Sequence, residues 1–418
     1  MVAILGICAL ALYLVTLQAG LYNDGIFFVE RLEAGEFVFN HLLYLPLAHL
    51  LHGLVAVVVP SMSMEASLKL LSAICAAGSV VLTFSVAVLV LNRIGVAGIG
   101  VAAIAAATLA LLPGCWFFAT ASELHAVNLL CATLLFLGLL HAVHEGRPWR
   151  LRHGTLQFLG AVLTPASHAS GVCAVLPAAY AVSRSSARQW VLVCLGLGFG
   201  AFAVTYLALL LSSRSLEHYH QVFSATHMVV FNDPGRVPGL LMTSLSELLL
   251  PAAPASTLVP VGLRLLFPAA PAWGWLCLLW LGAWPLMAFP IGEQAYGSYY
   301  LPTYPVQALL AVVAMRRLSR DLRSAVVITA VAVLPGVAAL LGQGWGLLAW
   351  WVCAAWLFFG PGVRAAATER PAVAVGLSLG LPLATLLLSG IGHVPAFGED
   401  PVRELIRALD RTAAVDAR

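Results

Sequence analysis

The chain alternates between long apolar runs and short polar stretches, and this pattern predicts membrane-spanning helices. A helix needs about 20 apolar residues to cross the hydrocarbon core of a bilayer. Stretches without Asp, Glu, Lys or Arg that are long enough for a crossing lie at 94–122, 153–183, 189–213, 265–292 and 371–398. A sixth such stretch, 324–363, has room for two crossings, with the Gly-rich segment 342–346 as the turn between them.

Composition agrees with this pattern. Of the 418 residues 61% are hydrophobic and 9% are charged, and the mean hydropathy is +0.96. An ordinary soluble domain carries about 25% charged residues, and even a large soluble fold leaves much of its surface in water. The chain is therefore predicted to be a polytopic membrane protein. Its net charge of only +3 gives no indication of a nucleic-acid partner.

Positive residues decide the predicted topology. If residues 41–60 crossed the membrane, the loop that carries Arg147, Arg150 and Arg152 would face outside, against the positive-inside rule. We therefore expect 41–60 to lie along the outer face or to dip in and return. Inside loops then hold 13 of the 21 cations. The expected crossings are 1–18, 68–91, 95–112, 123–143, 154–167, 169–183, 189–211, 241–263, 272–290, 299–316, 324–342, 344–362 and 371–391.

The predicted fold is an all-α polytopic membrane protein with about 11–13 transmembrane helices in one transmembrane domain, residues 1–391. A first extracytoplasmic loop spans 19–67, a second spans 212–240, and a short extracytoplasmic tail spans 392–418. Residues 1–18 lack the positive start of a signal peptide, so we expect a retained first helix. High Ala content and the preference for Arg over Lys suggest a GC-rich bacterial genome, and hence the bacterial inner membrane.

The densest polar group follows the first helix. It begins with the Asn-Asp-Gly turn that contains Asp24, and four acids fall within 13 residues. Carboxylates so placed can act as a general base or bind a cation. Glu30, Glu33 and Glu36 equally suit the solvated face of a loop helix, whereas Asp24 directly follows the helix. Asp24 is therefore the first candidate for a functional carboxylate.

Three further polar groups fall at the outer ends of predicted crossings. Polar side chains are costly in membrane helices and usually face the protein interior or a cavity. Structural explanations exist as well, among them helix capping by Ser122 and an interfacial belt of tyrosines. The groups are 120–128 with Glu123, His125 and Asn128; 163–170 with Pro165 and His168; and 292–302 with Glu293, Gln294 and Tyr299. Because all four groups fall on one face, they indicate an extracytoplasmic site.

In this order, the residues resemble the GT-C superfamily of membrane glycosyltransferases, and more narrowly the protein O-mannosyl-transferase-like family. Asp24-Gly25 stands where that family has the aspartate of its Asp-x-Gly-Glu-Phe motif. Residues 41–47 are similar to its His-Pro-Pro-Gly-Tyr-Pro-Leu motif at His41, Pro46 and Leu47, with Tyr44 between them but without Pro-Pro-Gly.

The later motifs continue the resemblance. Residues 123–128 keep the Glu and Asn of Glu-x-Tyr-x-Leu-Asn, with His125 in place of Tyr. Gly160 through Ser167-His168 is similar to Gly-x-x-x-x-Asn-His, and the 299–302 segment is similar to the Tyr-x-x-Pro stretch late in many GT-C enzymes. The resemblance covers about residues 1–185 and 290–316, and it implies a juxtamembrane helix within 41–60.

The resemblance implies that a sugar moves from a polyprenyl-phosphate donor to a hydroxyl of a protein, lipid or glycan acceptor, with inversion at the anomeric carbon. Asp24 would be the general base. The departing phosphate needs positive charge or oriented donors, which Arg31, Arg214 or Arg236 can supply, with His41 and His168 when protonated. A divalent metal is possible, but no ligand spacing indicates one. Membrane lipids are further partners. The substrate-binding candidates are Glu30, Arg31, His41, Tyr44, Glu123, His125, Asn128, His168 and Tyr299.

Two other interpretations stay open. A lipid or small-molecule transporter or flippase would share the helix count and tolerate a broken helix. It predicts functional charges near the bilayer midplane, where the sequence offers few besides Glu247. A catalytically degenerate GT-C relative is the third interpretation, because several motifs depart from the family pattern.

Overall fold

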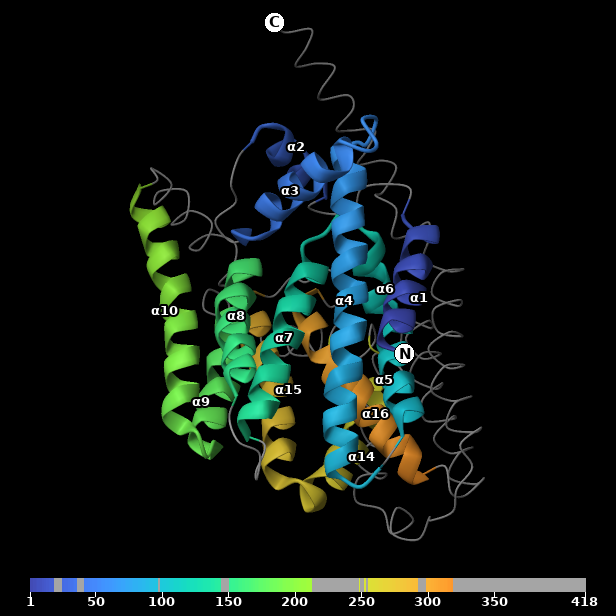
Figure 1. Ribbon diagram of the computed structural model, residues 1–418, viewed down its shortest axis with the longest axis vertical. Coiled ribbons are helices and arrows are strands. Elements are labelled where there is room, and N and C mark those ends of the chain that lie inside the picture. The colour runs from blue at the N-terminus through green and yellow to red at the C-terminus, as the bar shows by residue number, and fades with distance from the viewer. Residues whose placement is uncertain are drawn as a thin grey trace, which may run out of the picture.

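The computed structural model describes most of the first three quarters of the chain (Figure 1). The described residues are 1–18, 25–35, 41–96, 98–143, 150–212, 248, 252, 255–291 and 298–318. Regular secondary structure in these ranges is helical throughout. Several predictions lie outside them: Asp24, loop residues 213–240, the crossings at 324–342, 344–362 and 371–391, and the tail.

Most of the helices follow the predicted apolar runs in order, but α14 overlaps only the end of the expected crossing at 241–263, most of which lies outside the described residues. Their bounds are α1 Val2–Val15, α2 Gly25–Glu33, α3 Tyr44–Ala56, α4 Met64–Arg93, α5 Ile99–Leu111, α6 Pro113–Thr120, α7 His125–Val143, α8 Leu151–Ser167, η2 Ala169–Ala174, α9 Val175–Arg184, α10 Arg188–Ser212, α14 Ala255–Ala269, α15 Pro271–Ile291, η4 Ser298–Thr303 and α16 Tyr304–Leu318.

Membrane spans are evident among these helices. Met64–Arg93, His125–Val143 and Arg188–Leu209 are each long and apolar enough to cross, and α5 and α6 make a fourth such span if taken together. The core packs around α4 and α7, whose apolar windows are 67% and 83% buried. The window of α10 is only 17% buried, and apolar side chains such as Leu197 and Val204 are exposed on it. The chain is an integral membrane protein.

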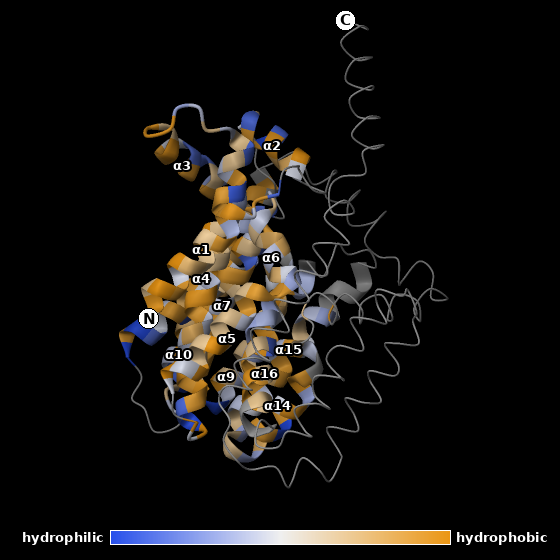
Figure 2. Cartoon of the chain, turned by 90° about the vertical axis from the view of Figure 1, so that its right-hand side faces the viewer, coloured by the Kyte–Doolittle hydropathy of each residue, from blue (hydrophilic) through white to orange (hydrophobic). Residues whose placement is uncertain are grey.

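The two ends of the bundle differ in their helices and in their charged residues. The short helices α2 and α3 lie across the end where α4 begins (Figure 1), so 41–60 is not a further long helix of the bundle. Figure 2 shows hydrophilic residues on α2 and again at the opposite end, while α3 and the flank between are mainly apolar. The opposite end holds the last residue of α4, Arg93, and the start of α8 and α10, with Arg150, Arg152 and Arg188. These arginines, which the sequence assigned to inside loops, thus share one end of the bundle, and the side of the membrane that this end faces stays a prediction.

Two helix breaks differ from the sequence-based expectation. The expected crossing at 95–112 is shorter, and α5 meets α6 at a bend of 62°. Leu112 is extended there because a residue that precedes proline is driven away from the helical region, and Pro113 then starts α6. Pro165 would be expected to break its helix, but it lies inside α8, which ends two residues later at Ser167, and the next residue, His168, is extended.

A close approach of α7 and α8 requires Gly160. A Cβ atom at this position would lie 2.5 Å from the Cα of Leu135 on α7. We expect Gly160→Ala to destabilise the protein by about 1–3 kcal/mol, the usual cost of overpacking, and to lower its melting temperature in detergent. Gly196→Ala on α10 is the matched control, because no atom lies within 4 Å of the added methyl group. Equal melting temperatures for the two variants would contradict this assignment.

Candidate active site

Side chains from four separate parts of the chain meet at the α2–α3 end. We call His41, His125, His168 and Tyr299 the histidine cluster. Ring centroids are 5.1 Å apart for His41 and His168, 5.8 Å for His125 and His168, and 5.0 Å for His168 and Tyr299. His168 is thus the centre of the cluster, which brings together residues 258 positions apart in the sequence.

The end of α8 places His168 at this centre. The helix stops at Ser167, and the imidazole Nδ1 then caps the following 3₁₀ helix by accepting the backbone N–H of Ser170 at 3.1 Å. The Ser170 hydroxyl lies 2.6 Å from the same nitrogen. Burial lowers the pKa of His168 from 6.5 to about 4, so the ring is neutral at neutral pH. Because Nδ1 is an acceptor, the proton of the neutral ring is on Nε2, which can donate a hydrogen bond.

The neutral state of His168 changes its expected role. The sequence suggested a protonated His168 as a source of positive charge for a departing phosphate. With a pKa of about 4, it can stabilise an oxyanion only as a neutral hydrogen-bond donor. Positive charge therefore has to come from other residues.

The loop before α3 carries His41 into the cluster. The backbone N–H of Leu43 donates to the carbonyl of Ala166 at 3.0 Å, which joins this loop to the end of α8. Phe28 of α2 packs edge-on against both His41 and Tyr44, with centroids 5.6 and 5.0 Å apart. Burial and the nearby Glu123 carboxylate raise the pKa of Tyr44 well above 10, so it is a neutral phenol.

The short link between α6 and α7 also borders the site, and it carries the buried Glu123. Glu123 is 1% exposed, and its Oε2 lies 3.9 Å from Nε2 of His125. The Ser72 hydroxyl of α4 donates to the Glu123 carbonyl at 2.9 Å and so holds the link in place. One turn into α7, Asn128 accepts from the Ser167 hydroxyl at 3.2 Å, directly before His168.

Several buried polar atoms of this region have no hydrogen-bond partner among the described residues. They include Nδ1 of His125, Nδ2 of Asn128, Oγ of Ser122 and Oγ1 of Thr164. A buried polar group without a partner is costly. Four of them beside one cluster are typical of a site that is completed by a ligand or by water.

Not every candidate residue joins the cluster. Glu30 and Glu33 lie on the exposed face of α2, opposite the buried Phe28 and Leu32. The Arg31 guanidinium lies 5.0 Å from the ring centroid of Phe27 on the same helix. Asp24, Glu293 and Gln294 lie outside the described residues. The structure therefore unites His41, Tyr44, Glu123, His125, Asn128, His168 and Tyr299 and leaves Glu30 on the surface.

The sequence did not reveal the hydrogen bond by which Lys69 holds the start of the first loop in place. Lys69, the chain's single lysine, is 5% exposed and donates from Nζ to the carbonyl of Gln18 at 2.8 Å, and it pairs with Glu65. Gln18 also donates to the carbonyl of Phe117 at 3.1 Å. The sequence did contain a hint of this contact, because a single lysine near the end of an apolar helix needs a partner for its charge.

Lys69→Met is expected to destabilise the protein by about 1–3 kcal/mol, because the half-buried Gln18 carbonyl loses a charged donor. Glu65→Gln removes only the ion pair, whose acid is 36% exposed, and should cost less than about 1 kcal/mol. Melting temperatures of the two variants in detergent measure the difference. If Glu65→Gln costs as much as Lys69→Met, the ion pair rather than the Gln18 bond holds the loop.

Among the described ranges, no group of three or more His, Cys, Asp or Glu side chains is arranged to hold a metal ion. The cluster's three imidazoles instead contact one another and Tyr299 through their rings.

The helical bundle, with its crossing short helices and polar cluster at one end, has the same overall fold as a known membrane-protein structure. The chain is similar to the crystal structure of ArnT from Cupriavidus metallidurans bound to undecaprenyl phosphate, with a TM-score of 0.53 and 16% sequence identity over 95% of this chain and 77% of that one.

Other comparisons add little to this likeness. The apo structure of the same ArnT matches equally, with a TM-score of 0.53, 17% identity, and coverage of 94% and 76%. A weaker similarity, with a TM-score of 0.46 and 12% identity over 90% of this chain and 55% of that one, is to the archaeal oligosaccharyltransferase AglB from Archaeoglobus fulgidus. No protein-family model matches the sequence, and no curated protein matches it.

Proposed function

We propose that this chain is a membrane glycosyltransferase that moves a sugar from a polyprenyl-phosphate-linked donor to a hydroxyl acceptor on the extracytoplasmic face. The observation that carries the proposal is the histidine cluster at the α2–α3 end of a GT-C-like fold, where His125 and His168 are buried beside polar atoms that have no partner among the described residues. The similar ArnT structure holds undecaprenyl phosphate, which supports a polyprenyl-phosphate donor. The resemblance to the O-mannosyl-transferase-like family supports mannose as the first sugar to test.

In the proposed reaction the acceptor hydroxyl attacks the anomeric carbon from the face opposite the phosphate. The bond between that carbon and the phosphate oxygen breaks, polyprenyl phosphate leaves, and Asp24 takes the acceptor proton. A single displacement of this kind inverts the anomeric configuration. Nε2–H of His168 and the free amide hydrogens of Asn128 are positioned as neutral donors to the phosphate or to sugar hydroxyls.

The positions of the charged side chains along the helices favour a transferase over a transporter. In the described helices α4, α7, α8 and α10, Asp, Glu, Lys and Arg occur only near helix ends. A transporter places functional charges near the bilayer midplane, at discontinuous helices. The buried polar residues here gather instead at one end of the bundle, where an enzyme that draws a water-soluble acceptor needs them.

Turnover of a donor panel tests the proposal. Purified full-length protein in nanodiscs is mixed with radiolabelled polyprenyl-phosphate sugars, with and without a chelator, and release of polyprenyl phosphate is measured. We expect release from at least one donor, with the mannosyl donor tested first. Release from none of the donors, by protein that still binds undecaprenyl phosphate, would favour a degenerate relative. Movement of an intact lipid across the bilayer would favour the flippase.

A further inference from the structure

A cavity lies at the end of the bundle opposite the histidine cluster, between the last turns of α4 and α7. It has a volume of about 510 Å³, which is in the range of ligand-binding pockets. His141 lies four turns along α7 from His125, which is about 24 Å at 1.5 Å per residue. The cavity is thus separate from the histidine cluster. Its lining residues are Phe84, Ser85, Val88, Leu89, Asn92, Arg93, Leu137 and His141.

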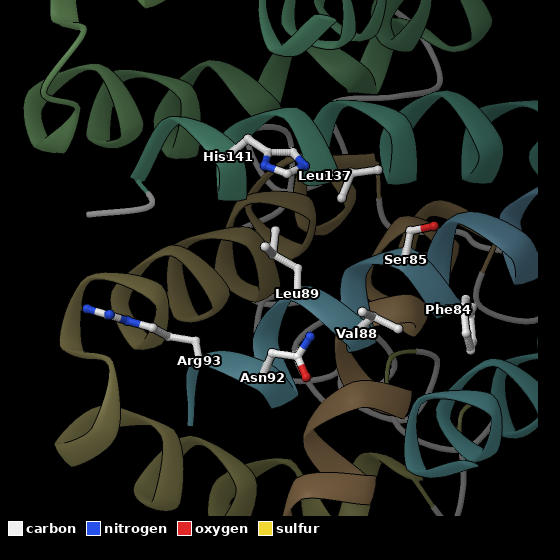
Figure 3. Close-up of a pocket in the computed structure, with 8 residues that line it drawn as sticks. All are labelled: Phe84, Ser85, Val88, Leu89, Asn92, Arg93, Leu137 and His141. Carbon is white, nitrogen blue, oxygen red and sulfur yellow. The ribbon is translucent and has the colours of Figure 1, made fainter. Parts of the chain in front are cut away.

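The cavity changes from apolar to polar along the helix axis (Figure 3). Phe84, Val88 and Leu137 line the end of the cavity away from Arg93, with the hydroxyl of Ser85 as the one polar group among them. Asn92, Arg93 and His141 lie toward the helix ends, and the Arg93 side chain extends past the last turn of α4. An occupant that matches this order has an apolar tail and a polar head.

Among the described residues, the charged side chains at the polar end are all basic. Arg150 and Arg152 begin α8, and His153 on the same helix stacks on His141 with ring centroids 4.3 Å apart. Across the described part of the chain, the acids Glu30, Glu33, Glu65 and Glu123 all belong to the α2–α3 end. The head of the occupant is therefore expected to be an anion.

We propose that this cavity binds an anionic glycerophospholipid of the adjacent leaflet. Its phosphate lies at Arg93, Asn92 and His141, and one acyl chain lies along Val88, Leu89 and Leu137. Basic pockets between membrane helices are known to select anionic headgroups. Unlike a free phosphate, a lipid also fills the apolar wall, which accounts for both halves of the cavity. This site is independent of the proposed transfer reaction.

Native mass spectrometry of the full-length protein tests the proposal. Dioleoyl phosphatidylglycerol and dioleoyl phosphatidylcholine, which share their chains, are the probes. We expect wild type to retain phosphatidylglycerol about fivefold better, the factor for about 1 kcal/mol per basic residue. Arg93→Gln should lower retention of phosphatidylglycerol to the level of phosphatidylcholine. Arg188→Gln, an exposed arginine at the same end but outside the cavity, should leave it unchanged.

Two further measurements test the roles of the lipid's acyl chain and of its phosphate. Val88→Phe fills the apolar wall without changing charge and should lower retention of both lipids. Millimolar inorganic phosphate should not displace phosphatidylglycerol. The proposal is overturned if wild type retains the two lipids equally, if Arg188→Gln lowers retention as much as Arg93→Gln, if Val88→Phe has no effect, or if phosphate displaces the lipid.

Discussion

Asp24→Asn is expected to lower donor turnover by a factor of about 10²–10⁴, the usual contribution of a general base. The amide keeps the size and much of the hydrogen bonding of the carboxylate but cannot take a proton from the acceptor. Binding of polyprenyl phosphate should therefore be unchanged, so the loss falls on kcat. Single-turnover release of polyprenyl phosphate, measured beside lipid binding, separates the two steps.

Glu33→Gln is the matched control for Asp24→Asn. It removes one carboxylate from the same loop, but Glu33 lies on the exposed face of α2. Exposed substitutions usually change stability by less than about 0.5 kcal/mol, so turnover should stay within about twofold of wild type. If Asp24→Asn also stays within that range, Asp24 is not the base, and Glu123, the buried carboxylate of the site, becomes the next residue to test.

The second large effect is expected at the centre of the histidine cluster. His168→Leu removes the neutral Nε2–H donor and leaves the Ser170 N–H without its acceptor. An unmade buried hydrogen bond costs about 1–3 kcal/mol, so turnover should fall by about 10- to 100-fold. His168→Gln keeps a donor and an acceptor and should recover much of this loss. A purely structural histidine would not show such recovery in kcat.

His49→Leu serves as the control for His168→Leu. His49 lies on the exposed side of α3, at the same end of the bundle, and makes no ring contact with the cluster in the described structure. Its removal should leave turnover unchanged. The role assigned to His168 is contradicted if His168→Leu folds normally and turns over donor as fast as His49→Leu does.

Much of the fold was predictable because hydrophobic length is written directly in the sequence. The expected crossings gave the positions of α4, α7, α8, α10 and α15, and the arginines predicted that 41–60 does not continue the bundle. The bend at Pro113 was missed because the apolar run continues through it, and only the backbone of Leu112 reveals the break. A count of apolar residues does not register such a turn.

The sequence predicted which residues lie together at the candidate site better than it predicted how they are arranged. Motif order brought His41, Glu123, His125, His168 and Tyr299 into one list, and the structure places them together. Sequence order gives no distances, so it could not tell that His168 is central or that Glu30 faces away. It also could not give the neutral state of His168, which depends on burial in the folded chain. Lys69 was overlooked because its partner, Gln18, is 51 residues away.

Location of the donor headgroup tests the central claim most directly. Undecaprenyl phosphate with a photoreactive group beside the phosphate is crosslinked to wild-type protein in nanodiscs, and the labelled peptides are sequenced. We predict labels on segments 41–50, 121–128 and 164–174, which surround the histidine cluster. Labels confined to the opposite end, around Arg93 and His141, would contradict a transferase site at the cluster.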